Sequence, residues 1–495
     1  MKFTLIDGLI VLAYVAAAVW AGMSVRRRVR TIADFLVAGR RLRYHLGVAT
    51  LVATELGLVT MMYFAEQGFR FGLAAFVIGV IWAAAYLTIG KTGFVVDRLR
   101  AMEIMTITEY FARRYGRGVR ILAASLLIIA GILSLGVFLK LGALFIVHFL
   151  GIPETSIHIT TTVLLILVLA YTALGGMVSV VLTDFIQFVF LALGMVLTTV
   201  LVISGHGFPG FFDRVAVAYG AVGLDPFGHP EYGWWFIAYW AVFAVSGCVL
   251  WQPVAQRILS AEHPDINRFI FRSTGLMFLG RAFFPIIWGV GAALMFGLDS
   301  DASAGMPRLL AEILPVGLLG LLTAGMFAAM MSTDSSYILA WSSIIVQDFL
   351  APLRRHSLND AQRLRATRWS IAVIGLLMLV FGIWYELKDT AFRYLLDVTT
   401  VYYAGGLPAL VLGLYWKRST TAGAYAAFIG GGLLPLSFVI EDILLQAGGA
   451  TGEGLIAGLM PPNVRGFLSF ALGFGGLFAG SLLSSETRSD RQPTR

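Results

Sequence analysis

Apolar segments of membrane-spanning length recur along the whole of this sequence. A helix needs about 20 predominantly apolar residues to cross the hydrocarbon core of a bilayer, and the chain contains about 13 such segments. Of the 495 residues, 58% are hydrophobic and only 13% are charged, a composition that excludes an ordinary soluble domain. The sequence therefore predicts an all-α polytopic protein of the cell membrane, with the lipid bilayer as its surroundings.

Arginines concentrate in three of the predicted loops, at residues 26–43, 98–120 and 354–368. The net charge of +8 therefore indicates how the chain is oriented in the membrane and does not indicate nucleic-acid binding. Loops rich in Lys and Arg stay on the cytoplasmic side, which predicts an N-terminus outside the cell and a C-terminus in the cytoplasm. Cys248 is the one cysteine, so the chain has no intrachain disulfide and no cysteine-based metal site.

Five consecutive polar residues, Ser332 to Ser336, interrupt the apolar segment 315–346. Hydrocarbon cannot satisfy these side chains, so they must face protein, water or an ion. Hydroxyl and carboxylate oxygens are hard ligands that suit Na⁺ or Ca²⁺. Ser332, Ser335 and Ser336 share one face of a helix, and Ala329 lies one turn earlier on that face. The alternative interpretation is a Ser/Thr-rich contact between helices.

Two predicted spans have small or polar residues at their centres. In 45–66 the interruption is Ala53–Gly57, and in 233–256 it is Ser246–Cys248, followed by Gln252 and Pro253. In the order of the predicted spans, these two are five positions apart, so they can be matching members of two repeats. Because five is an odd number, the second repeat crosses the membrane in the opposite direction to the first. Broken helices at matching positions of inverted halves indicate a transport site at the membrane midplane. There, freed carbonyl oxygens can hold a cation, and half-helix N-termini can face an anion.

Ionisable residues inside predicted spans need a separate explanation, and besides Asp334 we consider Glu55, Arg281, Asp184 and Lys140. Glu55 could bind a substrate ammonium, act near a sodium ion, take up a proton, or brace the broken helix through a salt bridge. Arg281 could hold a substrate carboxylate through two parallel hydrogen bonds, or pair permanently with Glu55 or Asp334. The side chains of Asp184 and Lys140 could extend along their helices to the membrane interface, where water would solvate the charge.

Several motifs resemble those of the sodium:solute symporter family, which shares the inverted five-helix repeat of the bacterial leucine transporter. They are ADFLVAGRRL (33–42), MTITEYFARRYG (105–116), ALGGMVSVVLTDFIQ (173–187), QPVAQRILSA (252–261), GMFAAMMSTDSS (325–336) and LYWKRSTTAGA (414–424). The resemblance implies a 5+5 inverted-repeat core with two broken helices, plus one extra N-terminal and two extra C-terminal helices. The expected division is an N-terminal helix and loop at 1–44, a first repeat at 45–203, an outer loop at 204–232, a second repeat at 233–416, and C-terminal helices with a short tail at 417–495.

The resemblance also implies a sodium site between the first broken helix and the segment 315–346. Carried over residue by residue, its ligands are the backbone carbonyls of Ala53, Leu56 and Ala329 and the hydroxyls of Ser332 and Thr333.

Some family members have a second sodium site, and the residues that match it here are Asp184, Ser332, Ser335 and Ser336. The sequence permits one or two sodium ions per cycle and leaves the number open.

Substrate contacts in the family lie on the second broken helix. Positions that carry aromatic residues in proline- or sugar-transporting relatives are matched here by Val245, Gly247, Cys248 and Val249, and Tyr402 lies on a nearby span. At the position of Glu55, proline transporters have an aspartate and sugar transporters an asparagine, and Arg281 resembles in placement a lysine of the sugar cavity. An acid and a base together suit a zwitterionic amino acid or a small carboxylate.

The function predicted is therefore sodium-coupled symport of a small organic solute by alternating access, without enzymatic chemistry. Three alternatives remain open. The first is a symporter of the same fold driven by protons, with Glu55 or Asp184 as the proton carrier. The second is a solute sensor that acts through a partner chain, and the third is a channel.

Overall fold

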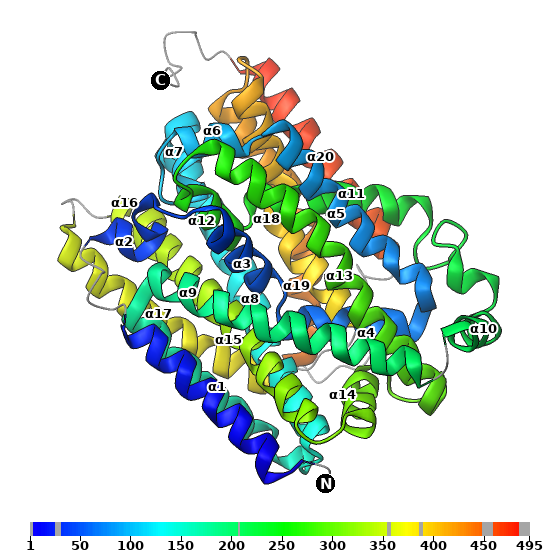
Figure 1. Ribbon diagram of the computed structural model, residues 1–495. Helices are drawn as coiled ribbons and strands as arrows, with labels where there is room; N and C mark the ends of the chain where they lie inside the picture. Colours follow the sequence, from blue (N-terminus) through cyan, green and yellow to red (C-terminus); the bar gives the residue numbers. More distant parts are fainter. Residues whose placement is uncertain are drawn as a thin grey trace.

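Helices make up nearly all of the protein, and the residues that the computed structural model describes contain no β-strand (Figure 1). The described residues are 3–24, 31–205, 208–353, 358–385, 390–447 and 459–484. The first part of the chain forms α1 (Leu5–Ser24), α2 (Ile32–Val37), α3 (Tyr44–Glu55), α4 (Leu58–Phe71), α5 (Phe76–Thr92), α6 (Val96–Ala101), α7 (Ile107–Tyr115), α8 (Arg117–Leu150), α9 (Ile157–Ser204) and α10 (Phe208–Tyr219). The second part forms α11 (Gly233–Leu250), α12 (Gln252–Ser260), α13 (Pro264–Phe296), α14 (Ala302–Ile313), α15 (Leu318–Ile344), α16 (Ala351–Leu353), α17 (Asp360–Trp384), α18 (Ala391–Tyr415), α19 (Thr421–Ala447) and α20 (Pro462–Leu483).

The predicted polytopic membrane architecture is confirmed, although the count of about 13 spans is not. Within the described residues, 10 helices are long and apolar enough to cross a membrane. Two further apolar helical stretches, Leu5–Ala18 within α1 and Ile157–Ile166, are shorter than the 18 residues required of such a helix. The second of these belongs to α9, which consists of two helical stretches that meet at Gly176. The backbone there has φ 56° and ψ −156°, a conformation open to glycine and strained for other residues.

The first broken helix lies where the sequence predicts it. Helix α3 ends at Glu55 and α4 begins at Leu58, and Leu56 between them has non-helical dihedral angles (φ −91°, ψ 59°). The second break lies further along the chain than predicted, because α11 continues through Ser246–Cys248 to Leu250. The chain leaves the helix at Trp251 (φ −65°, ψ 120°), and α12 then starts with Pro253 in its first turn. Proline favours the first turn of a helix and disrupts its interior, so it sets the start of α12.

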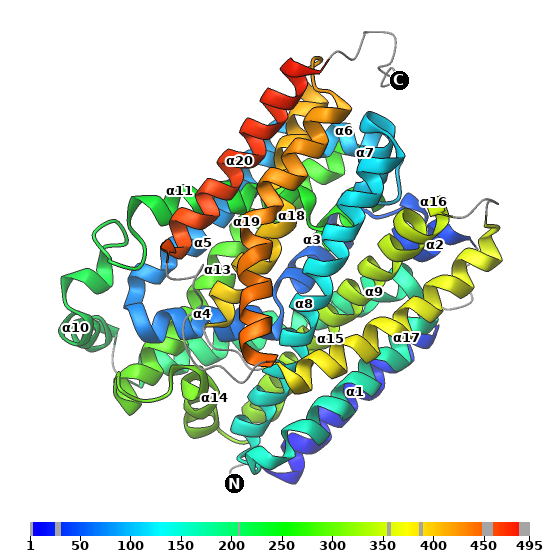
Figure 2. The ribbon, with the colours of Figure 1, turned by 180° about the vertical axis from the view of Figure 1, so that it is seen from behind.

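The predicted extra helices lie at the periphery of the core. Helix α1 packs against α9 and α15, and the Asp7 carboxylate accepts hydrogen bonds at 2.8 Å from the backbone N–H groups of Gly317 and Gly320. At the other end of the chain, α19 and α20 pack against each other and against α18 (Figure 2).

The arginine-bearing segments gather at one end of the molecule, where α2, α6, α7 and α16 lie together, while α10 and α14 lie at the other end (Figures 1 and 2). Arg40 after α2 donates to the carbonyl of Glu103 before α7 at 2.5 Å, and Arg120 of α8 pairs with Asp348 at 2.7 Å. This arrangement agrees with the prediction that the three loops share one side. Which compartment that side faces stays a prediction, and residues 25–30 and 354–357 of these loops lie outside the described residues.

Candidate functional site

The first broken helix touches the polar run of α15 directly. Thr333 donates a hydrogen bond from Oγ1 to the carbonyl of Thr54 at 3.1 Å. A β-carbon added at Gly57 would lie 2.5 Å from that same Oγ1. A side chain at position 57 would therefore force Thr333 to move, so glycine at the break allows the two elements to meet in this arrangement.

The five predicted ligands of the sodium site come from these two elements. Ala53 and Leu56 belong to the break in the first broken helix, and Ala329, Ser332 and Thr333 belong to α15; all five are buried. No hydrogen bond to the carbonyls of Ala53 or Leu56 is found in the described part of the chain. Carbonyl and hydroxyl oxygens without a nitrogen or sulfur ligand suit a hard cation, so the residues fit Na⁺. Their role as ligands stays a prediction.

Asp184 of α9 is fully buried beside this region and does not extend to the membrane interface. Its Oδ1 accepts a hydrogen bond from Ser332 at 2.5 Å, and its Oδ2 accepts one from Thr50 at 2.5 Å. Ser335 donates instead to the carbonyl of Ser332, within its own helix. Asp184 and Ser332 of the predicted second sodium site are therefore hydrogen-bonded to each other, whereas the Ser335 hydroxyl is engaged by the backbone carbonyl of Ser332.

Arg257 of α12 is a buried residue of the site that the sequence interpretation missed. Its side chain is 1% exposed, and its guanidinium reaches Asp184 Oδ2 at 3.3 Å and Ser336 Oγ at 2.7 Å. The signal was present in the stretch QPVAQRILSA, where an arginine lies in the short helix directly after the second break. Every residue of α12 is buried, so this arginine has no exposed face to occupy.

Glu55 and Arg281 form a second buried ion pair, with 3.5 Å between Oε2 and Nη1. Arg281 also donates to Thr60 Oγ1 at 3.2 Å, and its guanidinium lies 4.2 Å from the centre of the Phe278 ring. Glu55 Oε1 and Arg281 Nε have no hydrogen-bond partner among the described residues. Of the two predicted partners of Arg281, the structure therefore selects Glu55 and not Asp334.

A cavity of about 90 Å³ contains this ion pair. Its walls are largely aromatic and include Tyr63, Trp82, Phe138, Trp240, Phe243, Trp251, Tyr337, Phe392 and Tyr403, besides the polar residues Glu55, Thr60, Ser134, Arg281 and Thr399. Aromatic rings around a few polar groups are typical of small-molecule sites.

Only two of the six predicted substrate residues, Glu55 and Arg281, line this cavity. The other four, Val245, Cys248, Val249 and Tyr402, do not. Because α11 is a continuous helix through this region, Trp240, Phe243 and Gly247 share the face that meets the cavity, and their neighbours point elsewhere. Tyr402 packs against Phe428 with 6.2 Å between ring centres, while the next residue, Tyr403, lines the cavity.

Phe392 and Leu396 of α18 line both this cavity and a larger one of about 530 Å³. The ring centre of Phe392 lies 5.4 Å from that of Tyr63 and 5.3 Å from that of Trp240. The larger cavity is also lined by Phe236 and Arg393. Phe392, the aromatic member of this shared pair, is thus a candidate partition between the ion-pair cavity and the larger cavity, which we call the vestibule.

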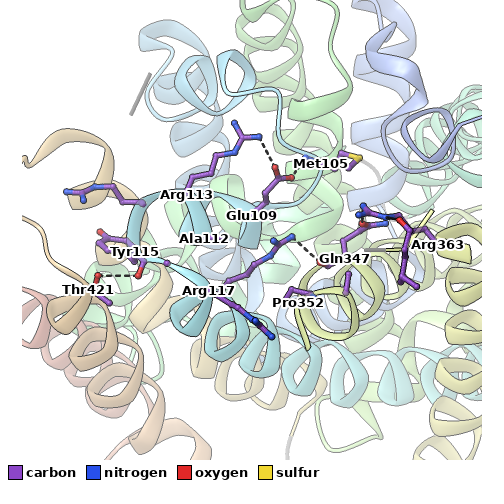
Figure 3. A pocket seen from close by; sticks show the side chains of 15 residues that line it. Met105, Glu109, Ala112, Arg113, Tyr115, Arg117, Gln347, Pro352, Arg363 and Thr421 are labelled. Carbon is purple, nitrogen blue, oxygen red and sulfur yellow. Dashed lines mark hydrogen bonds and ion pairs between the residues drawn. The ribbon is translucent and has the colours of Figure 1, made fainter. Parts of the chain in front are cut away.

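A third cavity, of about 730 Å³, lies at the arginine-rich end and contains none of the predicted site residues (Figure 3). Arg113 pairs with Glu109 at 2.8 Å, and Arg363 donates to Gln347 Oε1 at 2.7 Å. Lys140 lies outside all three cavities and donates to the carbonyl of Tyr385 at 2.5 Å. The candidate transport site is therefore the small central cavity and the adjoining contact of α3 with α15.

Comparison with known proteins identifies the family. The model of the sodium:solute symporter family matches residues 35–431 of the chain. The protein belongs to the sodium:solute symporter family. This match confirms the family predicted from the motifs. It supports sodium-coupled symport as the function, which is that of a membrane transporter rather than an enzyme.

Individual relatives agree with this assignment. The chain is 25% identical over 493 residues to a sodium/glucose cotransporter from Vibrio parahaemolyticus, covering 89% of this chain and 87% of the relative. It is 25% identical over 452 residues to a sodium/sialic acid symporter from Proteus mirabilis, covering 86% and 88%. Among solved structures, a substrate-bound, outward-open Na⁺-coupled sialic acid symporter matches with a TM-score of 0.80 and 19% identity, covering 98% of this chain and 99% of that one. The family fold, including its inverted-repeat core, is thus confirmed.

Proposed function

We propose that this symporter couples the inward flow of Na⁺ to the import of a small solute that carries a carboxylate group. The contact between Thr333 and the carbonyl of Thr54 at the first break carries the sodium part of this proposal. A cation held there by Ala53, Leu56, Ala329, Ser332 and Thr333 would join the broken helix to α15. In folds of this type, alternating access moves one group of helices against the other around a fixed central site.

The ion pair of the central cavity supports the solute class. Glu55 Oε1 and Arg281 Nε are buried polar atoms without partners in the described chain, and such atoms are costly unless a ligand satisfies them. A carboxylate can bind a guanidinium through two parallel hydrogen bonds, and an ammonium group can bind the glutamate. A zwitterionic amino acid would supply both groups. A sialic acid symporter among the relatives also fits an acidic solute.

A sugar is the second candidate, because glucose cotransporters are among the relatives and because the cavity walls are rich in aromatic rings. Sugar hydroxyls can both donate to Glu55 and accept from Arg281.

A thermal-shift screen of the purified protein would separate the two candidates. It compares amino acids, monocarboxylates, sialic acid, neutral sugars and polyols, in sodium and in potassium at equal ionic strength. We expect a carboxylate-bearing solute to raise the melting temperature in sodium only. Stabilisation by neutral sugars alone would replace the carboxylate proposal with the sugar one, and equal stabilisation in potassium would contradict sodium coupling.

The partition at Phe392 makes a prediction of its own. Phe392→Ala connects the central cavity with the vestibule, so we expect the solute to escape more readily and sodium to leak without solute. The measurement is sodium entry into proteoliposomes in the absence of solute. Phe236→Ala is the matched control, because Phe236 lines the vestibule alone. Equal leak in the two variants would show that Phe392 is no partition.

A further inference from the structure

The Arg257 guanidinium is surrounded by oxygens in the way a bound cation is. Its Nη2 lies 2.6 Å from Thr54 Oγ1 and 2.7 Å from Ser336 Oγ. Asp184 Oδ2 and Thr50 Oγ1 are each 3.3 Å from the same nitrogen. Nη2 carries two protons and faces four oxygens, which is more than two hydrogen bonds require.

These oxygens overlap with the predicted second sodium site. Asp184 and Ser336 belong to both sets, and the other carboxylate oxygen of Asp184 already accepts from Ser332 at 2.5 Å. A sodium ion at Asp184 would need the same lone pairs that now point at Nη2. Guanidinium and sodium carry the same charge, so within a fully buried space of this kind one excludes the other.

We propose that the Arg257 guanidinium takes the place of a second sodium ion at Asp184, so that the protein binds and moves one sodium ion per cycle. The inference rests on the proposed function and deepens it by fixing the ion count. Arg257 neutralises Asp184 permanently, because an arginine side chain stays protonated at any physiological pH. The transported ion is then the one held between the first break and α15.

The position of Arg257 explains how a tethered cation can do the structural work of a bound ion. Helix α12 follows the second break, and α3 precedes the first. Through Nη2, Arg257 joins α12 to α3 (Thr50 and Thr54), to α9 (Asp184) and to α15 (Ser336). A second sodium ion at the predicted site would join two of these helices, α9 and α15, and be released on each cycle. The arginine joins all four and moves no charge across the membrane with the solute.

Counting the sodium ions bound by the purified, full-length protein tests the inference without knowledge of the solute. Equilibrium dialysis with radioactive sodium, at constant ionic strength set with potassium, should give one saturable sodium ion per chain. Two sodium ions per chain would overturn the inference while leaving sodium coupling intact. No saturable sodium binding would overturn the proposed function itself, so the two failures are distinguishable.

Variants of Arg257 provide the second arm. Arg257→Met should expose Asp184 and raise the count to two sodium ions, with cooperative binding, whereas Arg257→Lys should keep it at one. The double variant Arg257→Met/Asp184→Asn should return the count to one. An unchanged count in Arg257→Met would overturn the inference, and if that variant does not fold, the count for the unmodified protein decides.

Arg465→Met is the matched control. Arg465 is another largely buried arginine paired with an aspartate, Asp397, at 3.0 Å, and it lies on α20, away from the site. Its replacement should lower stability without changing the sodium count. A rise in the count for this control as well would show that the effect of Arg257→Met is not specific to Asp184.

Discussion

Replacing Arg281 with glutamine is expected to reduce uptake of the transported solute by about thirtyfold or more. Truncating one partner of a buried charged pair typically costs about 2–5 kcal/mol, and about 1.4 kcal/mol corresponds to a factor of ten. In this protein the truncation removes the guanidinium that, among the described residues, lines the central cavity, and it leaves Glu55 without its ionic partner. The measurement is sodium-driven uptake into proteoliposomes at matched protein levels.

The control for this prediction addresses stability. Breaking a buried ion pair is destabilising in itself, by about 3–5 kcal/mol, so lost uptake could reflect lost protein. The double variant Glu55→Gln/Arg281→Gln removes both charges and should recover stability without recovering uptake of a carboxylate solute. Unchanged uptake of every carboxylate in Arg281→Gln would remove Arg281 from the substrate site.

Replacing Thr333 with alanine is expected to raise the sodium concentration that gives half-maximal uptake by about tenfold to a hundredfold. Hydrogen bonds to charged groups contribute about 1.5–3 kcal/mol, and we take the contribution of a hydroxyl ligand to the binding free energy of the ion to be similar. Ser332→Ala should have an effect of the same order, since its hydroxyl is the other predicted side-chain ligand. The measurement is the sodium dependence of uptake at a fixed solute concentration.

Two variants make the Thr333 prediction specific. Thr333→Ser keeps the hydroxyl and should retain most of the sodium affinity. Ser342→Ala removes a buried hydroxyl of the same helix that donates to the carbonyl of Leu339, so it should leave the sodium dependence unchanged. A shift in Ser342→Ala as large as that in Thr333→Ala would assign the effect to general loosening of α15.

The features predictable from the sequence are those written into a single local stretch. The five polar residues of α15 and the Ala53–Gly57 interruption each stand out in an apolar background, and the structure brings Thr333 against the carbonyl of Thr54. The second break was placed too early because glycine and serine inside α11 resemble an interruption, whereas Pro253 sets the actual boundary.

The features that could not be predicted depend on helix phase and on contacts between distant segments. Matching family positions along α11 selected Val245, Cys248 and Val249, but the phase of an unbroken helix turns other residues toward the cavity. Arg257 was missed because its four oxygen partners come from three other helices, and no pattern within α12 reveals them. The ion count depends on this contact, so the sequence left it open.

The central claim, a sodium ion held between the first broken helix and α15, is tested most directly by the melting temperature of the purified protein titrated with sodium. Potassium at equal ionic strength is the reference, and no solute is added. We predict that sodium, but not potassium, raises the melting temperature of the unmodified protein and of Ser342→Ala, and that in Thr333→Ala the same rise requires about tenfold to a hundredfold more sodium. A sodium-specific rise in Thr333→Ala equal to that of the unmodified protein at the same sodium concentrations would contradict the claim.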